Sequence, residues 1–448
     1  MRARLRSWWY DVEQSLWFLP AVLTAVAMLL AVLTVRLDQT IVADRRTEVA
    51  WIFGGGAEGA RGVLQAIAGT MITVTGLVFS ITVVALQLAS SQLTPRVLRA
   101  FMGDRGNQAV LGFFIGTFTY ALLVLRVVRS PLEGAGGFVP SLSVTLAIVL
   151  ALVSVALLIY FIHHAANSMR ASVVIDRTAV ATRELIAHLY PDEVGEAALL
   201  IPPAWLATAP AALVCAEGSG YVQEFNVEAL FALAERHTLI IRLEPLVGDF
   251  VLPGAPVASV WPASALDEDI LRAIRAAPVL GPERTLHADL AFGVQQLSDI
   301  AVKALSPGIN DPTTAILCID RLGEILVRLA NRGQPEAVRR SDDGQVRVVL
   351  PGSSFARIVG IAFDPIRHYG AGDPTVAAHL MTSLGWIAAL TPSVHRSPLV
   401  EQARCVLTAM HAQLRIPQDR ERVERAGAWL GQSASLAGEA WRHEDFDR

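Results

Sequence analysis

Four long apolar runs in the first 165 residues constrain the fold of this chain more than any other feature. Each run can cross a hydrocarbon core of about 30 Å, which needs roughly 20 helical residues. The runs predict transmembrane helices over residues 16–35, 63–89, 109–128 and 142–162. The first run is too long for the apolar part of a signal peptide and lacks a small-residue cleavage site. We therefore expect it to be retained as a helix.

Composition excludes several classes of protein. The 448 residues are 53% hydrophobic and 17% charged, so the chain has ample apolar surface to bury and is not intrinsically disordered. A formal net charge of −4 leaves no electrostatic footprint for nucleic acid. Cys215, Cys318 and Cys405 form no paired motif, which predicts buried thiols in a reducing compartment. We expect no metal site, no cofactor and no nucleic-acid partner.

Arginines in the short loops predict the orientation of the spans in the bilayer. Three precede the first run, three lie between the second and third runs, and two follow the fourth, namely Arg2, Arg4, Arg6, Arg96, Arg99, Arg105, Arg170 and Arg177. The opposite loops also hold arginines, so the asymmetry is modest. Because the number of spans is even, both termini lie on one side of the lipid bilayer. We expect that side to be the cytoplasm.

The second run carries a face of small and polar residues. Spacings of three and four connect Gly69, Thr73, Gly76, Ser80, Val84, Gln87 and Ser91. This spacing is typical of a helix that packs against another helix. In one interpretation the face only allows close packing, with Gly112 and Gly116 of the third run as its smooth counterpart. In the other, the same face from several subunits surrounds a water-filled path and replaces part of an ion's hydration shell.

Gln87 is the strongest single candidate for a functional position in the spans. An amide inside a span is costly unless it is paired or hydrated. None of the four expected spans has an interior Asp, Glu, Lys or Arg, which would cost about 2.5 to 3.5 kcal/mol on insertion scales. A coupled carrier built on buried carboxylates is therefore disfavoured. At the end of the fourth run, His163 and His164 are expected to be interfacial anchors, with a pH-sensing pair as the alternative.

The rest of the chain has the composition of a soluble protein. Residues 166–205 predict a helical connector, and residues 206–262 change to a period of two, which predicts a small β-rich module. Residues 263–448 predict a mainly α-helical domain with one strand near 346–350. The fold class is therefore a membrane α-helical domain with four transmembrane helices, followed by a cytoplasmic α+β region. The segment 246–257 resembles the turn of a biotinyl-lipoyl module but has no lysine nearby, so it predicts a structural or ligand-docking module.

Two Asp-Pro pairs, Asp311-Pro312 and Asp373-Pro374, are expected to open helices in the last part of the chain. Asp at the N-cap accepts amide hydrogens that have no helical partner, and Pro at the first position has no amide hydrogen. No spacing matches a known catalytic motif, so no catalytic residue is assigned. Around the first pair, loop ordering is favoured over a polar site. The candidate residues for such a site are His287, Asp289, Asp299, Lys303, Ser306, Asn310 and Asp311.

Several segments together carry a resemblance to one protein family. They are residues 79–82, 86–92, 95–96, 101–104, 111–120 and 304–312. On these residues the chain resembles a bacterial family of predicted membrane proteins, domain of unknown function two-two-five-four. The resemblance covers nearly the whole chain and implies a multi-pass protein of the bacterial inner (plasma) membrane, with no implied activity. The chain departs from the family pattern at Gln295, Lys303 and Thr313, where the family often has Arg, Arg and Phe.

Three functions are consistent with these patterns. The leading hypothesis is a homo-oligomeric ion channel or passive pore, lined by the second helix, with a cytoplasmic domain that gates it or senses an ion or small ligand. The second is a non-transporting membrane scaffold or signalling receptor, in which the same face only packs helices. The third is a membrane-bound enzyme, which would need His287, Asp289, Asp299 and Asn310 to converge in one pocket.

Overall fold

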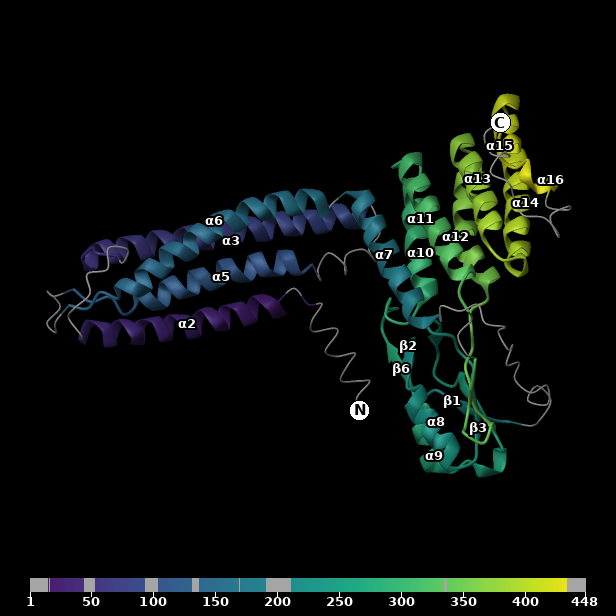
Figure 1. Ribbon diagram of the computed structural model, residues 1–448, viewed down its shortest axis with the longest axis horizontal. Helices are drawn as coiled ribbons and strands as arrows, with labels where there is room; N and C mark the ends of the chain where they lie inside the picture. Colours follow the sequence, from purple (N-terminus) through teal and green to yellow (C-terminus); the bar gives the residue numbers. More distant parts are fainter. Residues whose placement is uncertain are drawn as a thin grey trace. The chain divides into compact units, whose positions relative to one another are not determined.

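The chain forms two compact units that meet in sequence between Val173 and Val174 (Figure 1). The basic residues expected near the N-terminus, together with Arg96 and Arg99, lie outside the described residues. The computed structural model describes residues 15, 17–43, 53–92, 104–130, 137–168, 170–190, 211–333 and 337–432. Within these ranges, side chains are described everywhere except at residues 41–43, 88–92 and 432.

Among its described residues, the N-terminal unit contains four helices that are long and apolar enough to cross a membrane, which confirms the four predicted spans. About half of the span in α5 is buried, against 22% to 28% of the other three spans. The third helix of the bundle is therefore its central one, and it packs against each of the others. The four are α2 (Phe18–Ala43), α3 (Ala57–Gln92), α5 (Arg105–Leu125) and α6 (Ser141–Ser168).

Two clusters of buried apolar residues hold the bundle together. One includes Leu64 of α3, Tyr120 of α5 and Val144 of α6. The other joins the same three helices around Phe114 and Phe161. Such packing, rather than the hydrophobic effect, is what holds helices together in lipid.

Two glycines let α2 approach α5 closely. A Cβ at Gly112 would lie 2.7 Å from the Cα of Pro20, and one at Gly116 would lie 3.2 Å from the Cβ of Ala27. These glycines therefore face α2. The expectation that they form the counterpart of the small-residue face on α3 is wrong within one subunit, because a Cβ at Gly69 or Gly76 of that face would meet nothing within 4 Å.

The C-terminal unit starts at Val174, within α7 (Ala171–Leu189), and this helix is followed by a β-rich module with two sheets. The five-stranded sheet has the order β1-β5-β3-β8-β7, and the three-stranded sheet has the order β4-β2-β6. All pairs are antiparallel except β3 with β8. The strands are β1 (Ala212–Cys215), β2 (Gly220–Phe225), β3 (Ile240–Leu243), β4 (Phe250–Val251), β5 (Pro256–Trp261), β6 (Pro278–Gly281), β7 (Val338–Arg340) and β8 (Val346–Val349).

The core of the β-rich module extends beyond residue 262. Val222 and Ile241, one from each sheet, pack in the same cluster. Ile274 of α9 (Glu268–Arg275) and Val348 of β8 complete it. Both lie beyond residue 262, and β8 coincides with the strand predicted near 346–350. Between β2 and β3 lies α8 (Val227–Arg236), whose first turn is capped by the side chain of Asn226, as the sequence predicts.

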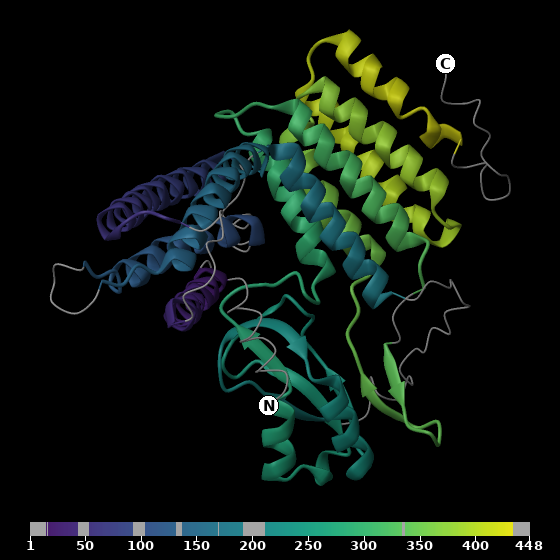
Figure 2. The same cartoon turned by 60° about the vertical axis from the view of Figure 1, so that its left-hand side comes forward.

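Helices pack against one another in the remainder of the C-terminal unit (Figure 2). Asp311 accepts a hydrogen bond from Thr314 N at 3.1 Å and Asp373 accepts one from Val376 N at 3.0 Å, so both predicted N-caps are confirmed. The helices are α10 (Leu290–Ala304), α11 (Pro312–Ala330), α12 (Phe355–Gly370), α13 (Pro374–Leu390), α14 (Arg396–Gln413), α15 (Pro417–Ala426) and α16 (Trp429–Gln432).

Candidate functional site

The small and polar residues of α3 lie on the side that faces away from its bundle. Leu64, Met71 and Val78 are buried against the other helices. At 3.6 residues per turn, the opposite side of α3 carries five exposed residues that we call the outer stripe. A Cβ placed at either glycine of the stripe would meet nothing within 4 Å. The outer stripe consists of Gly69, Thr73, Gly76, Ser80 and Gln87, and the side chain of Ser91 lies outside the described residues.

Large apolar residues flank the outer stripe on both sides. Ile72 and Phe79 are 51% and 55% exposed on one flank, and Leu77 and Val84 are 54% and 52% exposed on the other. The stripe is therefore a shallow polar strip between two apolar ridges. Between Arg61 and its C-terminal end, α3 contains no charged residue.

The outer surfaces of α2 and α6 are different in character. Both helices expose large apolar side chains, of the kind that lipid tails solvate well. The polar stripe on α3 contrasts with these surfaces, because lipid offers no hydrogen bonds to its hydroxyl, amide and backbone groups. The exposed apolar residues include Val22, Val26, Leu29 and Leu33 on α2 and Val149, Leu152, Val155 and Ile159 on α6.

A buried carboxylate lies at one end of the bundle. The helix α2 continues beyond the predicted end of its span, so Asp38 lies inside it and is only 3% exposed. The carboxylate accepts hydrogen bonds from Leu142 N at 2.9 Å and from the Oγ of Ser143 at 2.6 Å. Beside it, the hydroxyl of Tyr120 lies 2.9 Å from the Oγ1 of Thr34. The hydroxyl of Tyr120 also donates to the carbonyl of Ser143 at 3.1 Å, so these groups connect α2, α5 and α6.

An Asp and a His from different helices meet near the start of α5. Asp104 caps α5 by accepting from Gly106 N at 2.9 Å, and the same oxygen lies 2.9 Å from the Nε2 of His164. The ring of Tyr160 stacks on His164, with centroids 5.3 Å apart. His164 is therefore half enclosed by protein, while its neighbour His163 is exposed.

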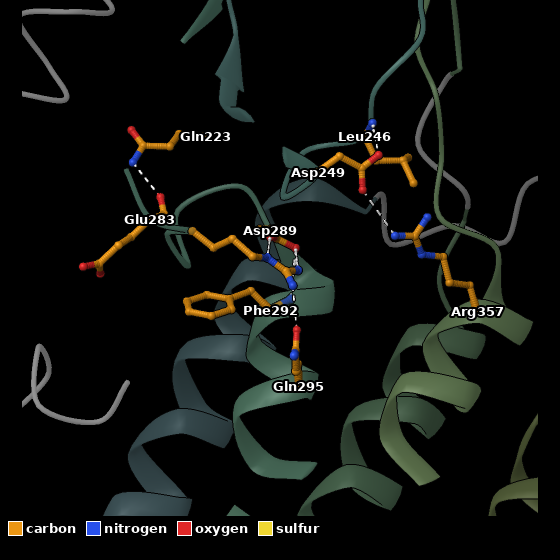
Figure 3. A network of polar contacts seen from close by, with 9 residues as sticks. Gln223, Leu246, Asp249, Glu283, Asp289, Phe292, Gln295 and Arg357 are labelled. Atoms are coloured by element: carbon orange, nitrogen blue, oxygen red, sulfur yellow. Dashed lines mark hydrogen bonds and ion pairs between the residues drawn. The ribbon is translucent and has the colours of Figure 1, made fainter. Parts of the chain in front are cut away.

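In the C-terminal unit, a polar cluster that includes Asp289 and Gln295 (Figure 3) forms around Arg284. Its guanidinium donates to both carboxylate oxygens of Asp289, at 2.7 Å and 3.0 Å, and to the Oε1 of Gln295 at 2.6 Å. It also lies 5.0 Å from the ring centre of Phe292. The Asp289 side chain is only 2% exposed, so this ion pair fixes the loop before α10 onto the helix.

Two further contacts join the β-rich module to the helices, one at this cluster and one at α12. Gly248 has a φ of +93°, and a Cβ there would collide with the Asp289 carboxylate, so the turn needs glycine. The next residue, Asp249, lies 3.5 Å from the guanidinium of Arg357 on α12 (Figure 3). Both contacts tie the turn before β4 to the helices.

The structure separates the other candidate residues of this region. Asp289 caps the start of α10, whereas Asn310 follows its end and is exposed with a φ of +48°. The 15 residues of α10 put these positions about 22 Å apart. His287 is exposed, Asp299 and Lys303 are half-buried, Ser306 donates to the carbonyl of Lys303 at 2.7 Å, and Asp311 caps α11. The structure therefore does not bring together the four side chains that the enzyme hypothesis requires in one pocket, namely His287, Asp289, Asp299 and Asn310.

Comparison with known proteins places the chain in a family. Residues 13–385 match the family described as Predicted membrane protein (DUF2254). The chain belongs to this family. The resemblance found in the sequence is thus confirmed, and the four candidate spans of this DUF2254 protein agree with the family description.

The relatives of this DUF2254 protein include mycobacterial proteins. An uncharacterized protein from Mycobacterium tuberculosis (strain CDC 1551 / Oshkosh) is 37% identical over 388 residues, covering 84% of this chain and 73% of the relative. An uncharacterized protein from Mycobacterium bovis is 36% identical over 386 residues, with the same coverage of both chains. No solved structure matches the chain.

Proposed function

We propose that this DUF2254 protein is a homo-oligomeric ion channel or passive pore of the bacterial inner (plasma) membrane, lined by the outer stripe of α3. The observation that carries the proposal is the exposure of the stripe on the side of α3 opposite its buried residues. An amide such as that of Gln87 costs several kcal/mol, roughly 2 to 7, when it is left without partners in an apolar medium. Water or further copies of the chain would remove that cost.

A ring of copies of the chain would hydrate the polar stripe and bury its apolar flanks at the same time. In a closed cyclic oligomer, equivalent surfaces converge on the symmetry axis. The stripes would then face the axis, while flanking residues such as Phe79 and Val84 would pack between neighbouring copies. The hydroxyl of Ser80 and the amide of Gln87 would replace part of an ion's hydration shell.

The chemistry of the stripe favours passive conduction. A coupled carrier needs a group that binds and releases its coupling ion, and the outer stripe has no titratable side chain. The carboxylate of Asp38 is instead occupied by the first turn of α6. With both termini in the cytoplasm, the C-terminal unit would gate the pore or sense an ion or small ligand.

Reconstitution into liposomes tests the pore. We expect flux of small ions, measured with anions and cations in turn, and a loss of about tenfold or more in Gln87→Leu and Ser80→Leu, which is about 1.4 kcal/mol in barrier height. Leu152→Val, on the exposed apolar side of α6, is the matched control and should conduct. Absence of flux under every ionic condition, or wild-type flux in both stripe variants, would contradict the proposal.

A non-transporting scaffold or signalling receptor is the second candidate. It is favoured by one observation, the hydrogen bond of 2.9 Å from the Oγ1 of Thr73 to the carbonyl of Gly69, which satisfies the hydroxyl without water. In a scaffold the stripes would pack directly on each other. The substitution Ser80→Cys distinguishes the two candidates. A charged, membrane-impermeant thiol reagent should label the new thiol in a water-filled pore and leave that thiol unlabelled in a dry interface.

A further inference from the structure

The helix α7 is the element through which the chain enters the C-terminal unit. It begins at Ala171, just after α6 ends at Ser168. One side of α7 is buried, including Ile175, Ala179 and Ile186. A conformational change in the helices that hold α7 would therefore act on the chain directly where it leaves the last span.

Alternating charges join α7 to α11. Asp176 of α7 pairs with Arg321 of α11 at 2.9 Å. Arg321 also pairs with Glu324, one turn further along α11, at 3.1 Å. Glu324 in turn pairs with Arg183 of α7. We call these four residues the α7–α11 charge chain, in which each of the two inner members has partners on both sides.

Two other contacts fix the position of α7. The Oγ1 of Thr182 lies against Gly293 of α10, where a Cβ would collide with it. Arg332, beyond the end of α11, donates to the carbonyl of Tyr190 at 2.6 Å and so covers the C-terminal end of α7. Neither contact is an ion pair between two charged side chains, so we expect both to be less sensitive to salt than the charge chain.

The charge chain is accessible to solvent ions. The side chains of Asp176, Arg321 and Glu324 are 50%, 41% and 40% exposed, and that of Arg183 is 20% exposed. Exposed pairs weaken as salt increases, because the screening length falls from about 30 Å at about 0.01 M to about 3 Å at about 1 M. Screening removes more favourable electrostatic interaction from a chain of alternating charges than from a single surface pair, since each inner member has two partners.

We propose that ionic strength regulates this protein through the α7–α11 charge chain, which holds α7 on α11 at low salt and releases part of that hold at high salt. The ligand of this regulatory site is dissolved salt itself. The regulatory role rests on the proposed function, because conduction is its output. The salt response of α7 is a separate property that can be measured without any flux.

Hydrogen exchange of the full-length protein in nanodiscs tests the salt response. Between about 0.01 M and about 1 M KCl we expect the amides of α7 to exchange about threefold faster, whereas those of α14 keep their rate. Sucrose at matched osmolality should have no effect, because it does not screen charge. Arg321→Gln removes the centre of the charge chain and should exchange fast in α7 at both salt concentrations.

Two further variants make the exchange experiment decisive. Arg272→Gln breaks an exposed pair with Asp269 on α9 and should keep the wild-type response of α7. Asp176→Asn removes one end of the charge chain and should show a reduced response even where Arg321→Gln does not fold. An α7 exchange rate that is independent of salt in the wild type, or a full salt response in Arg321→Gln, would overturn the inference.

Flux through liposomes then separates this inference from the pore. If conduction changes with internal KCl in the wild type and no longer does so in Arg321→Gln, both proposals hold. An exchange response without any flux would reject the pore but would still support the salt response of α7. Flux whose salt response survives in Arg321→Gln would reject the regulation and leave the pore standing.

Discussion

Asp38 of α2 caps the helix α6 from outside by accepting hydrogen bonds from both the backbone and the side chain of Ser143. The backbone bond is 2.9 Å and the side-chain bond 2.6 Å, and Leu142 N adds a third at 2.9 Å. An anion at a helix N-terminus is favourable because unpaired N–H groups and the helix dipole both point toward it. The carboxylate thus joins the first span to the fourth.

Removing this cap should destabilise the bundle. In Asp38→Ala, a buried N–H group of Ser143 and a half-buried one of Leu142 lose their acceptor, at about 1 to 3 kcal/mol for a buried group and less for the other. We expect the free energy of unfolding in detergent to fall by about 3 kcal/mol, and by less in Asp38→Asn, which retains one carbonyl oxygen. Glu58→Gln, at an exposed position of α3, is the control. Equal stability of Asp38→Ala and the control would show that the cap contributes nothing.

The two glycine faces of the bundle should respond oppositely to a methyl group. Gly112→Ala places a Cβ 2.7 Å from the Cα of Pro20, which should cost about 1 to 3 kcal/mol as α2 is pushed away. Gly69→Ala meets open space within the subunit and should leave the fold at least as stable, since Ala favours helix. Thermal unfolding in detergent measures both. A loss at Gly69 as large as that at Gly112 would mean that the stripe packs inside the fold.

The ion pair of Arg284 with Asp289 should contribute strongly to the stability of the C-terminal unit. Asp289→Asn leaves a guanidinium facing a neutral amide in a buried site and weakens the cap of α10. We expect the free energy of unfolding in urea to fall by about 2 to 4 kcal/mol. Asp269→Asn, which breaks an exposed pair on α9, should cost about 1 kcal/mol or less. Similar midpoints for the two variants would contradict this ranking.

The three cysteines should differ in reactivity. Cys318 is fully buried in α11, and burial raises the pKa of its thiol well above the ordinary value, so the reactive thiolate is scarce. Cys215 and Cys405 are only half-buried. In the double variant Cys215→Ser/Cys405→Ser, a maleimide at neutral pH should leave the folded protein unlabelled and should label Cys318 once the protein is unfolded. Intact mass measures the labelling. Prompt labelling of the native double variant would place Cys318 in contact with solvent.

The parts of this fold that were predictable are those encoded by neighbouring residues. The four spans follow from uninterrupted apolar runs, and the caps at Asp311 and Asp373 from a local Asp-Pro pair. The small-residue face of α3 follows from its spacing, but the sequence leaves open whether that face points into the bundle or out of it. That depends on which side of α3 is the more apolar, with Leu64 and Met71 turned inward.

The parts that were not predictable depend on partners that are distant in sequence. Asp38 and Ser143 are 105 positions apart, and His164 and Asp104 are 60 apart, so no local pattern pairs them. The strand β6 was missed because it is four residues long, between Pro278 and Gly281, and is defined only by its pairing with β2. Asp289 was singled out as a polar candidate, but its partner Arg284 was not, since nothing in a loop sequence indicates where a long side chain turns.

The stability of the C-terminal unit should also depend on pH through His395. Its ring lies against Phe355, with centroids 4.8 Å apart, and partial burial lowers its pKa below the ordinary value of 6.5 because the charged imidazolium loses hydration. The folded chain therefore binds this proton less readily than the unfolded chain. This contribution to stability is complete above pH 6.5 and is lost as the pH falls through the lowered pKa.

Replacing His395 isolates that contribution. His395→Phe keeps an aromatic contact with Phe355 but cannot titrate, so its free energy of unfolding should fall less steeply than that of the wild type as the pH is lowered from neutral. Denaturant unfolding of the full chain at a series of pH values measures the slope. His237→Gln, at the exposed end of α8, serves as the matched control and should keep the wild-type slope. If His395→Phe and the wild type have the same slope, the source of the acid sensitivity lies elsewhere.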